Sequence, residues 1–177
     1  VSQSAIAFFG VYYKLQSFIY MPANGLIQGM RPLISYNFGA NHLNRVKEII
    51  KVSIICNGII LSLGTVLFFV FPEPILSWFS ATDELLKIGI SGLRIISFSF
   101  IVSTIGVVIS GVFEALGNGR NSLTISLLRQ FIITLPLSYV LLQFVGLNGV
   151  WATFVIAETI ASIIAWLLLK KEFKSYQ

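Results

Sequence analysis

Long apolar stretches separated by short polar segments dominate the sequence. No Asp, Glu, Lys or Arg occurs in residues 52–72, 95–113 or 130–157. A helix needs about 20 mostly apolar residues to cross the hydrocarbon core of a bilayer. Each of these stretches is about that long or longer, and together they predict several membrane-spanning helices.

The complete pattern predicts an all-α integral membrane protein with five transmembrane helices. The expected spans are about 12–38, 45–71, 84–116, 121–144 and 149–170. Residues 1–11 are expected to be the end of a truncated transmembrane helix that reaches the first span through a short turn, so that 12–177 form the bundle. Pro72 ends the second span, because proline cannot continue a helix there. Residues 82–84 (Thr-Asp-Glu) are typical of a helix start.

One stretch within the first span carries an unusual set of residues. Two prolines and two glycines interrupt residues 22–41. Asn24, Gln28 and Arg31 lie three to four residues apart and therefore share one helical face. A helix that only anchors a protein has no need of such a face, so we expect these three residues to line a cavity. Gln130 in the fourth span is a further candidate for the cavity wall.

Two oppositely charged residues lie deep inside predicted spans. Arg129 is expected roughly 13 Å, and Glu158 roughly 18 Å, from the inner face of the membrane. Because consecutive antiparallel helices are usually neighbours, we expect Arg129 and Glu158 to form an intramembrane ion pair. Such a pair either holds the two helices together or gives Glu158 a role with a proton or cation. Arg31 lies less deep, and its side chain either reaches the membrane surface or serves a substrate.

Composition and charge narrow the class of protein. The chain is 56% hydrophobic and 11% charged, with a mean hydropathy of +0.88, whereas soluble domains carry about 25% charged residues. The net charge is +5, but the basic residues gather at span ends rather than in a patch with aromatics, which argues against nucleic acid. Their concentration in residues 45–51, at Arg120 and in the tail 170–174 predicts a cytoplasmic C-terminus.

No motif indicates an enzyme, a metal site or a cofactor. Cys56 and His42 are each the sole residue of their type, so no cluster of metal ligands can form from them. No phosphate-binding glycine loop and no nucleophile motif is present. The expected function is therefore transport rather than catalysis.

Several motifs resemble one family of transporters. The first is the pattern P-x-x-G-x-x-x-G-x-x-P-x-x-x-x-N-x-G-A, formed by Pro22, Gly25, Gly29, Pro32, Asn37, Gly39 and Ala40. It closely resembles the second helix of each half in multidrug and toxic compound extrusion (MATE) transporters. Residues 113–122 (FEALGNGRNS) resemble the family's link between the fourth and fifth helices of a half. Residues 129–139 and 146–154 resemble the fifth and sixth helices. Residues 34–41 (ISYNFGAN) are most similar to the bacterial multidrug exporter branch.

The resemblance implies a fold and a mechanism for the whole protein. The family has twelve helices in two lobes, and this chain would be the C-terminal half. The implied activity is secondary active multidrug and xenobiotic efflux by antiport with protons or sodium ions, with alternating access between the lobes. The coupling ion would be bound mainly by the N-terminal lobe, since the middle of the span 84–116 holds no acid.

Partners and location follow from the same resemblance. The implied partners are the lipid bilayer, the N-terminal lobe and small cationic or amphipathic substrates, in a bacterial plasma membrane. Two alternatives remain open at this point. One is a lipid-linked oligosaccharide flippase of the same superfamily. The other is a truncated or auxiliary membrane partner without transport of its own.

Overall fold

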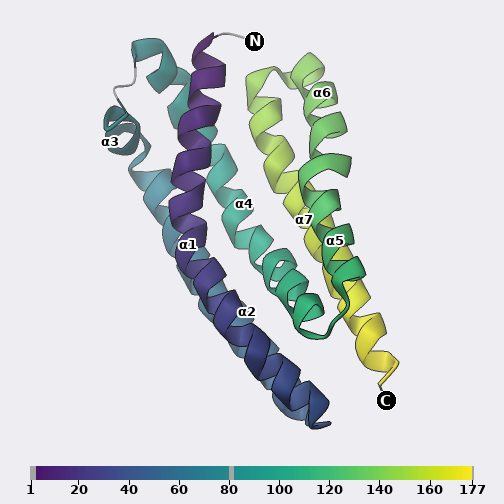
Figure 1. Ribbon diagram of the computed structural model, residues 1–177. Helices are drawn as coiled ribbons and strands as arrows, with labels where there is room; N and C mark the ends of the chain where they lie inside the picture. Colours follow the sequence, from purple (N-terminus) through teal and green to yellow (C-terminus); the bar gives the residue numbers. More distant parts are fainter. Residues whose placement is uncertain (1–2, 80–81, 177) are drawn as a thin grey trace.

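The protein is a bundle of long helices that run alternately up and down (Figure 1). This computed structural model describes residues 3–79 and 82–176, and no strand occurs among them. The helices are α1 (Gln3–Gly39), α2 (Leu43–Val70), α3 (Pro72–Ser77), α4 (Asp83–Ala115), α5 (Gly119–Leu127), η1 (Leu128–Ile132), α6 (Thr134–Val145) and α7 (Leu147–Lys174). The predicted all-α membrane class is confirmed.

Within the described ranges 3–79 and 82–176, four helical segments are long and apolar enough to cross a membrane. They are α2, α4, the continuous rod Gly119–Val145 made of α5, η1 and α6, and α7. These correspond to the last four predicted spans. The first predicted span lies within α1, which is longer than any other helix but carries polar residues along its length.

The predicted turn near residue 12 is wrong. Helix α1 continues without interruption from Gln3 to Gly39, so residues 3–11 belong to the same helix as 12–38. Aromatic residues in this region favour continuation, because Phe8 and Tyr12 lie one turn apart on the face that packs into the bundle. Pro22 and Pro32 lie inside α1 without breaking it, as is common in membrane helices.

The other helix ends agree with the predicted signals. Helix α2 ends just before Pro72, which begins the short α3. The hydroxyl of Thr82 accepts a hydrogen bond from the Leu85 amide at 3.4 Å and caps α4. The turn after α4 places Gly117 at a φ of +75°, a conformation that glycine adopts readily.

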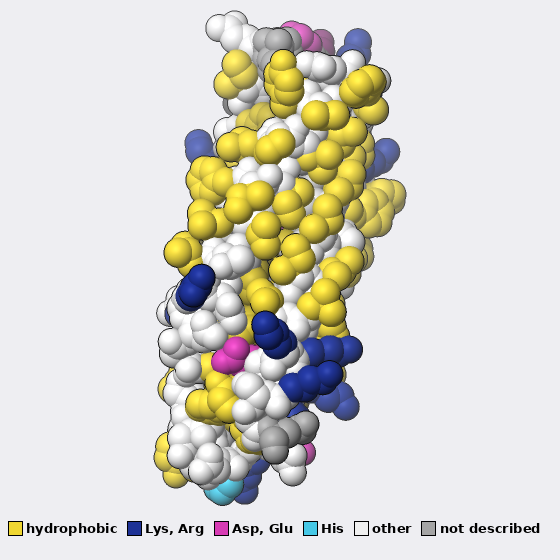
Figure 2. All heavy atoms as spheres, turned by 90° about the vertical axis from the view of Figure 1, so that its right-hand side faces the viewer, with side chains coloured by type: hydrophobic (Ala, Val, Ile, Leu, Met, Phe, Trp, Pro, Cys, Tyr) yellow, Lys and Arg dark blue, Asp and Glu magenta, His cyan; other side chains and the backbone are white. Residues whose placement is uncertain are grey.

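One end of the bundle collects most of the basic residues. The α1–α2 loop (40–42), the α4–α5 turn and the C-terminus lie together at the lower end of Figure 1; we call it the basic end. Figure 2 shows the α5–α7 side, where hydrophobic side chains cover the middle and Lys and Arg gather in the lower part. This distribution suits a bundle that lies in lipid with one basic rim.

Two clusters of apolar side chains are stacked along the bundle. The cluster far from the basic end includes Phe8, Tyr12, Leu61, Phe68, Phe100 and Trp151. The cluster near the basic end includes Ile27, Ile34, Val46, Val112, Ile125 and Leu169. Helices α1, α2, α4 and α7 contribute to both clusters, so the bundle is held together over its full length.

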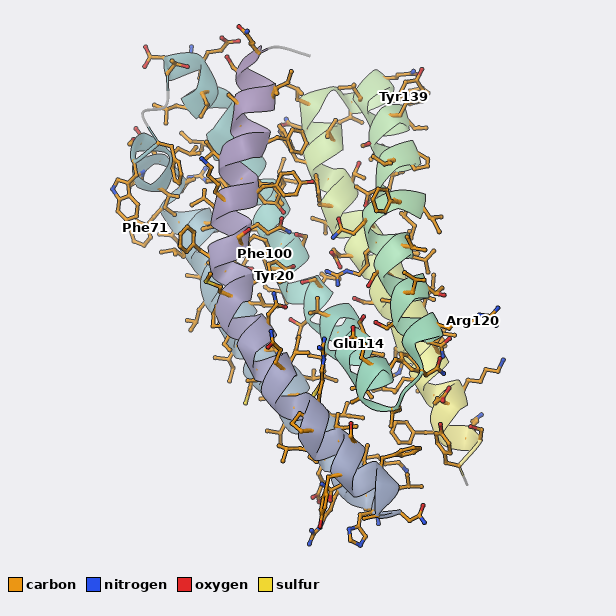
Figure 3. The ribbon with its side chains drawn as sticks, viewed as in Figure 1. Tyr20, Phe71, Phe100, Glu114, Arg120 and Tyr139 are labelled. Carbon is orange, nitrogen blue, oxygen red and sulfur yellow. The ribbon has the colours of Figure 1, made fainter. Side chains whose placement is uncertain are left out.

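Polar contacts lie between the two clusters. The hydroxyls of Tyr20 and Ser103 are 2.6 Å apart, and the Tyr20 ring meets Phe100 edge-on (Figure 3). The Ser162 hydroxyl donates to the Val102 carbonyl at 2.8 Å and accepts from the Gly106 amide at 3.2 Å. Lipid offers no hydrogen bonds, so polar groups at this depth must find partners within the protein.

Candidate functional site

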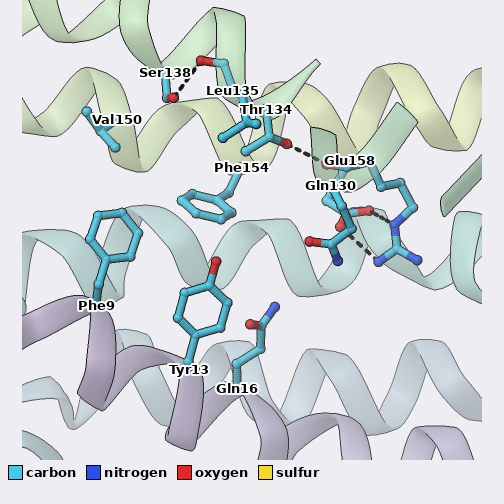
Figure 4. A pocket seen from close by; sticks show the side chains of 11 residues that line it. Phe9, Tyr13, Gln16, Gln130, Thr134, Leu135, Ser138, Val150, Phe154 and Glu158 are labelled. Atoms are coloured by element: carbon cyan, nitrogen blue, oxygen red, sulfur yellow. Dashed lines mark hydrogen bonds and ion pairs between the residues drawn. The ribbon is translucent and has the colours of Figure 1, made fainter. Parts of the chain in front are cut away.

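A cavity of about 230 Å³ lies between α1, the η1–α6 segment and α7 (Figure 4). Its wall combines aromatic rings, amides, hydroxyls and one pair of charges. The lining residues are Phe9, Tyr13, Gln16, Arg129, Gln130, Thr134, Leu135, Ser138, Val150, Phe154 and Glu158. Cavities that bind small molecules typically have such a lining, largely apolar with a few convergent polar groups.

Arg129 and Glu158 form a two-pronged ion pair at one side of this cavity. The Nε atom of Arg129 donates to Oε2 of Glu158 at 2.8 Å, and its second guanidinium nitrogen donates to Oε1, also at 2.8 Å. Each side chain is only 13% exposed. The contact predicted from the antiparallel order of the two helices is therefore present. Its geometry is that of the strongest side-chain ion pairs.

The local backbone around Arg129 is a wide helical turn. Residues 128–132 form a π-helix, in which the Ile133 amide donates to the Leu128 carbonyl at 3.2 Å. Pro136 follows four residues after Ile132; its ring has no N–H and would clash with the Ile132 carbonyl in a regular α-helix. The Thr134 hydroxyl donates to the Arg129 carbonyl, which the widened turn leaves accessible. Such turns frequently occur at functional sites.

Aromatic rings form the opposite wall. The Phe9 ring lies 6.3 Å from Tyr13 and 6.1 Å from Phe154 between centroids. Gln16 follows Tyr13 on the same face of α1, and Gln130 faces it from η1 (Figure 4). The charges of Arg129 and Glu158 cancel, so the lining has no net charge. A neutral, aromatic cavity of this kind can hold an organic cation over its ring faces.

The structure places only some of the predicted cavity residues in the cavity wall. Gln130 lines the cavity. Asn24 and Gln28 are on α1 and lie outside its lining. They continue the same face, however, because Gln16, Tyr20, Asn24 and Gln28 follow one another at four-residue spacing. The residues that the sequence interpretation missed are Tyr13 and Gln16, and extending the spacing backward from Asn24 would have found them.

Arg31 belongs to a second ion pair. Its guanidinium lies 2.5 Å from a Glu114 carboxylate oxygen, and the two side chains are 40% and 39% exposed. The other Glu114 oxygen accepts from the Ser122 hydroxyl at 2.9 Å. The Ser35 hydroxyl donates to the Ala115 carbonyl at 2.7 Å and joins the same two helices. These contacts tie α1, α4 and α5 together toward the basic end.

The described residues contain no group of three or more His, Cys, Asp or Glu that could hold a metal ion. Arg129 and Glu158, the two charged residues of the cavity lining, are paired with each other.

Comparisons with known proteins agree on one family. The MatE family profile matches residues 1–140. The chain is 30% identical over 165 residues to the multidrug export protein MepA of Staphylococcus aureus strain MSSA476, covering 93% of this chain and 36% of that protein. It is 31% identical to MepA of Staphylococcus haemolyticus over the same shares. The chain thus spans about a third of the length of these relatives, which are transporters rather than enzymes.

Solved structures show the same fold. An outward-facing multidrug resistance MATE family transporter superposes with a TM-score of 0.92 at 18% identity, covering 98% of this chain and 40% of that one. The inward-facing conformation of such a transporter gives 0.91, with 97% and 40% covered. The MATE multidrug transporter DinF-BH, solved as a complex, gives 0.83 at 31% identity, with 92% and 36% covered.

Proposed function

This chain belongs to the MatE family of membrane transporters, and on that premise we propose that it forms part of a multidrug exporter. The observation that carries the proposal is the cavity beside Arg129 and Glu158. It offers aromatic rings, two amides and the neutral Arg129–Glu158 pair within a membrane bundle. The ring faces suit small organic cations through cation–π contact, and the amides beside apolar walls suit amphipathic molecules.

We further propose that the chain is the C-terminal lobe of a two-lobe protein. Its share of 36% of the curated relatives is close to that of a lobe lacking one helix. It is similar to nearly equal extents to outward-facing and inward-facing transporters. A unit whose internal packing suits both states can move as a rigid body, and rocking of two such units gives alternating access.

Energy for export would come from antiport with protons or sodium ions. No residue of this chain is assigned to that coupling, because Glu158 already has Arg129 as its partner and the middle of α4 holds no acid. The coupling ion would be bound mainly by the N-terminal lobe. The location would be a bacterial plasma membrane, with the basic end and the C-terminus in the cytoplasm.

The geometry favours a drug exporter over a lipid-linked oligosaccharide flippase. The pyrophosphate of such a lipid needs unpaired cations in the substrate cavity, where Arg129 is neutralised by Glu158. The alternative of an auxiliary partner without transport has no observation in its favour.

A test of the proposal fills the cavity. In the complete protein that carries this chain, Gln16→Trp should slow efflux of a fluorescent organic cation from cells, because the indole would occupy the space beside Tyr13. Phe18→Trp is the matched control, since Phe18 is 68% exposed on another face of α1. Equal membrane levels of both variants must be verified.

Two results would contradict the proposal. Efflux at the unmodified rate in Gln16→Trp would show that the cavity lies off the substrate path. Efflux that persists after the proton and sodium gradients have been dissipated, each alone and then together, would exclude antiport.

A further inference from the structure

A second and larger hollow lies between α2, α4 and α7. It measures about 1060 Å³ and shares no lining residue with the Arg129–Glu158 cavity. Most of its wall is aliphatic, with Ile55, Ile101, Ile105, Ile163 and Leu167 all exposed to the surroundings. We call it the α2–α4–α7 groove. Its open apolar wall lies on the outer surface of the bundle and does not face the bundle interior.

Four lysines lie at one end of this groove. Lys47 and Lys51 come from α2, and Lys170 and Lys174 come from α7. No Asp or Glu contributes to the lining. All four belong to the basic end of the bundle, so the groove is apolar toward the middle of the protein and cationic at its rim.

No carboxylate pairs with any of these ammonium groups among the described residues. Lys47 instead lies over the Phe173 ring at 5.7 Å, and Lys170 over the Trp166 ring at 5.6 Å. The nearest acid in sequence on α7, Glu172, is engaged by Asn118 and Tyr176. The cationic rim is thus available to an anion from outside the chain.

The apolar part of the groove is about as deep as one leaflet. Along α7 the lining runs from Thr159 to Lys174, and the part from Thr159 to the first lysine, Lys170, is roughly 17 Å long at helical rise. Half of a hydrocarbon core of about 30 Å is about 15 Å. An acyl chain lying along the isoleucines would therefore place its headgroup phosphate beside the lysines.

We propose that the α2–α4–α7 groove binds an anionic glycerophospholipid of the leaflet at the basic end. The acyl chains lie against the aliphatic wall, and the phosphate and anionic headgroup contact the lysines, as in other basic pockets between membrane helices. A second copy of this chain fits less well, because a symmetric contact would bring the same four lysines against each other. The proposal does not depend on what is transported.

The test uses fluorescence of Trp166, which lines the groove. The complete protein is reconstituted into phosphatidylcholine bilayers that contain either brominated phosphatidylglycerol or brominated phosphatidylcholine as the quencher. Subtracting the signal of Trp166→Phe isolates this one tryptophan. We expect stronger quenching by the anionic lipid at equal mole fraction.

Variants separate the groove from general surface charge. Each lysine near a membrane surface contributes about a fivefold factor in affinity for anionic lipid, so Lys51→Gln with Lys170→Gln should weaken phosphatidylglycerol binding about 25-fold. Phosphatidylcholine quenching should not change. Arg45→Gln with Lys171→Gln is the matched control, because both residues are at the basic end but outside the groove.

Three outcomes would overturn the proposal. Equal quenching by the two lipids would show that the headgroup is not selected. An equal loss of preference in the test and control pairs would assign the effect to overall charge. Absence of quenching by either lipid would show that protein, from the other lobe or a second copy, covers the groove.

Discussion

Breaking the Arg129–Glu158 pair from one side should cost far more stability than removing it entirely. Glu158→Leu leaves a guanidinium in a site where the Arg129 side chain is 13% exposed, with both of its hydrogen bonds to the carboxylate lost. Arg129→Met leaves the carboxylate in the same position. The double replacement leaves neither charge.

The expected magnitudes follow from burial. Removing one partner of a buried ion pair costs about 3–5 kcal/mol, because the other charge remains without compensation. Replacing both by apolar residues of similar size is often neutral or stabilising. The two single costs therefore should not add, and the double variant should recover most of the lost free energy of unfolding.

The assay is a double-mutant cycle on the complete protein in lipid nanodiscs. The free energy of unfolding of the four proteins is compared at one temperature, and cation efflux is measured in parallel in cells. A stable double variant that has lost efflux would assign the pair to transport. A stable double variant with unmodified efflux would assign it to holding α7 against the η1 turn.

The reasoning would be refuted by additive losses. If the double variant is less stable than the unmodified protein by the full sum of the two single costs, then Arg129 and Glu158 do not compensate each other in the folded protein. Arg31→Met with Glu114→Leu is a suitable comparison. Those side chains are 40% and 39% exposed, so breaking that pair should change stability by about 1 kcal/mol or less.

Three further predictions concern packing, a hydrogen bond and a titration. Gly92→Ala should destabilise the protein by about 1–3 kcal/mol in thermal unfolding, because its Cβ would stand 2.6 Å from the buried Phe8 ring. Gly25→Ala, which has no neighbour within 4 Å, should be tolerated. Tyr20→Phe should cost about 1 kcal/mol in the same assay. Ser103→Ala should cost less in the Tyr20→Phe background than in the unmodified protein, since the two hydroxyls bond to each other and only the bond from Ser103 to the Phe100 carbonyl is then left to lose. The hydrogen bond to Glu172 raises the pKa of Tyr176, so Glu172→Ala should return it toward the ordinary value of about 10, as read from tyrosinate absorbance. This contribution to folding is present below pH about 10 and is lost as the pH rises through the raised pKa.

Local signals predicted the elements and one contact of the site. Apolar length indicated the spans, and Thr82 and Pro72 marked real helix ends. The antiparallel order of two spans placed Arg129 opposite Glu158. These succeeded because each depends only on nearby residues or on the order of neighbouring helices.

Other features could not be predicted, because they depend on how helices rotate and lean against one another. The pair Arg31–Glu114 joins residues far apart in sequence, on helices that are not consecutive. Small residues four apart, such as Gly25 with Gly29 and Gly106 with Ser110, permit close helix approach, but Gly25 and Gly29 face open space, whereas the Gly106 amide donates to the Ser162 hydroxyl of α7 at 3.2 Å. Sequence spacing defines a face of a helix but not what that face meets.

The amino-acid sequence by itself determined that this protein lies in a membrane as alternating helices and that it resembles the MATE transporters. Apolar length, proline and glycine positions and basic span ends suffice for this, because the bilayer restricts what a chain can do. Only the tertiary structure decided that α1 is unbroken through residue 12, that Tyr13 and Gln16 complete the cavity, and that the lysines of α2 and α7 meet at one groove. The cavity and the groove depend on the rotation of each helix about its axis, to which packing contacts such as the one between the Phe8 and Trp151 rings contribute.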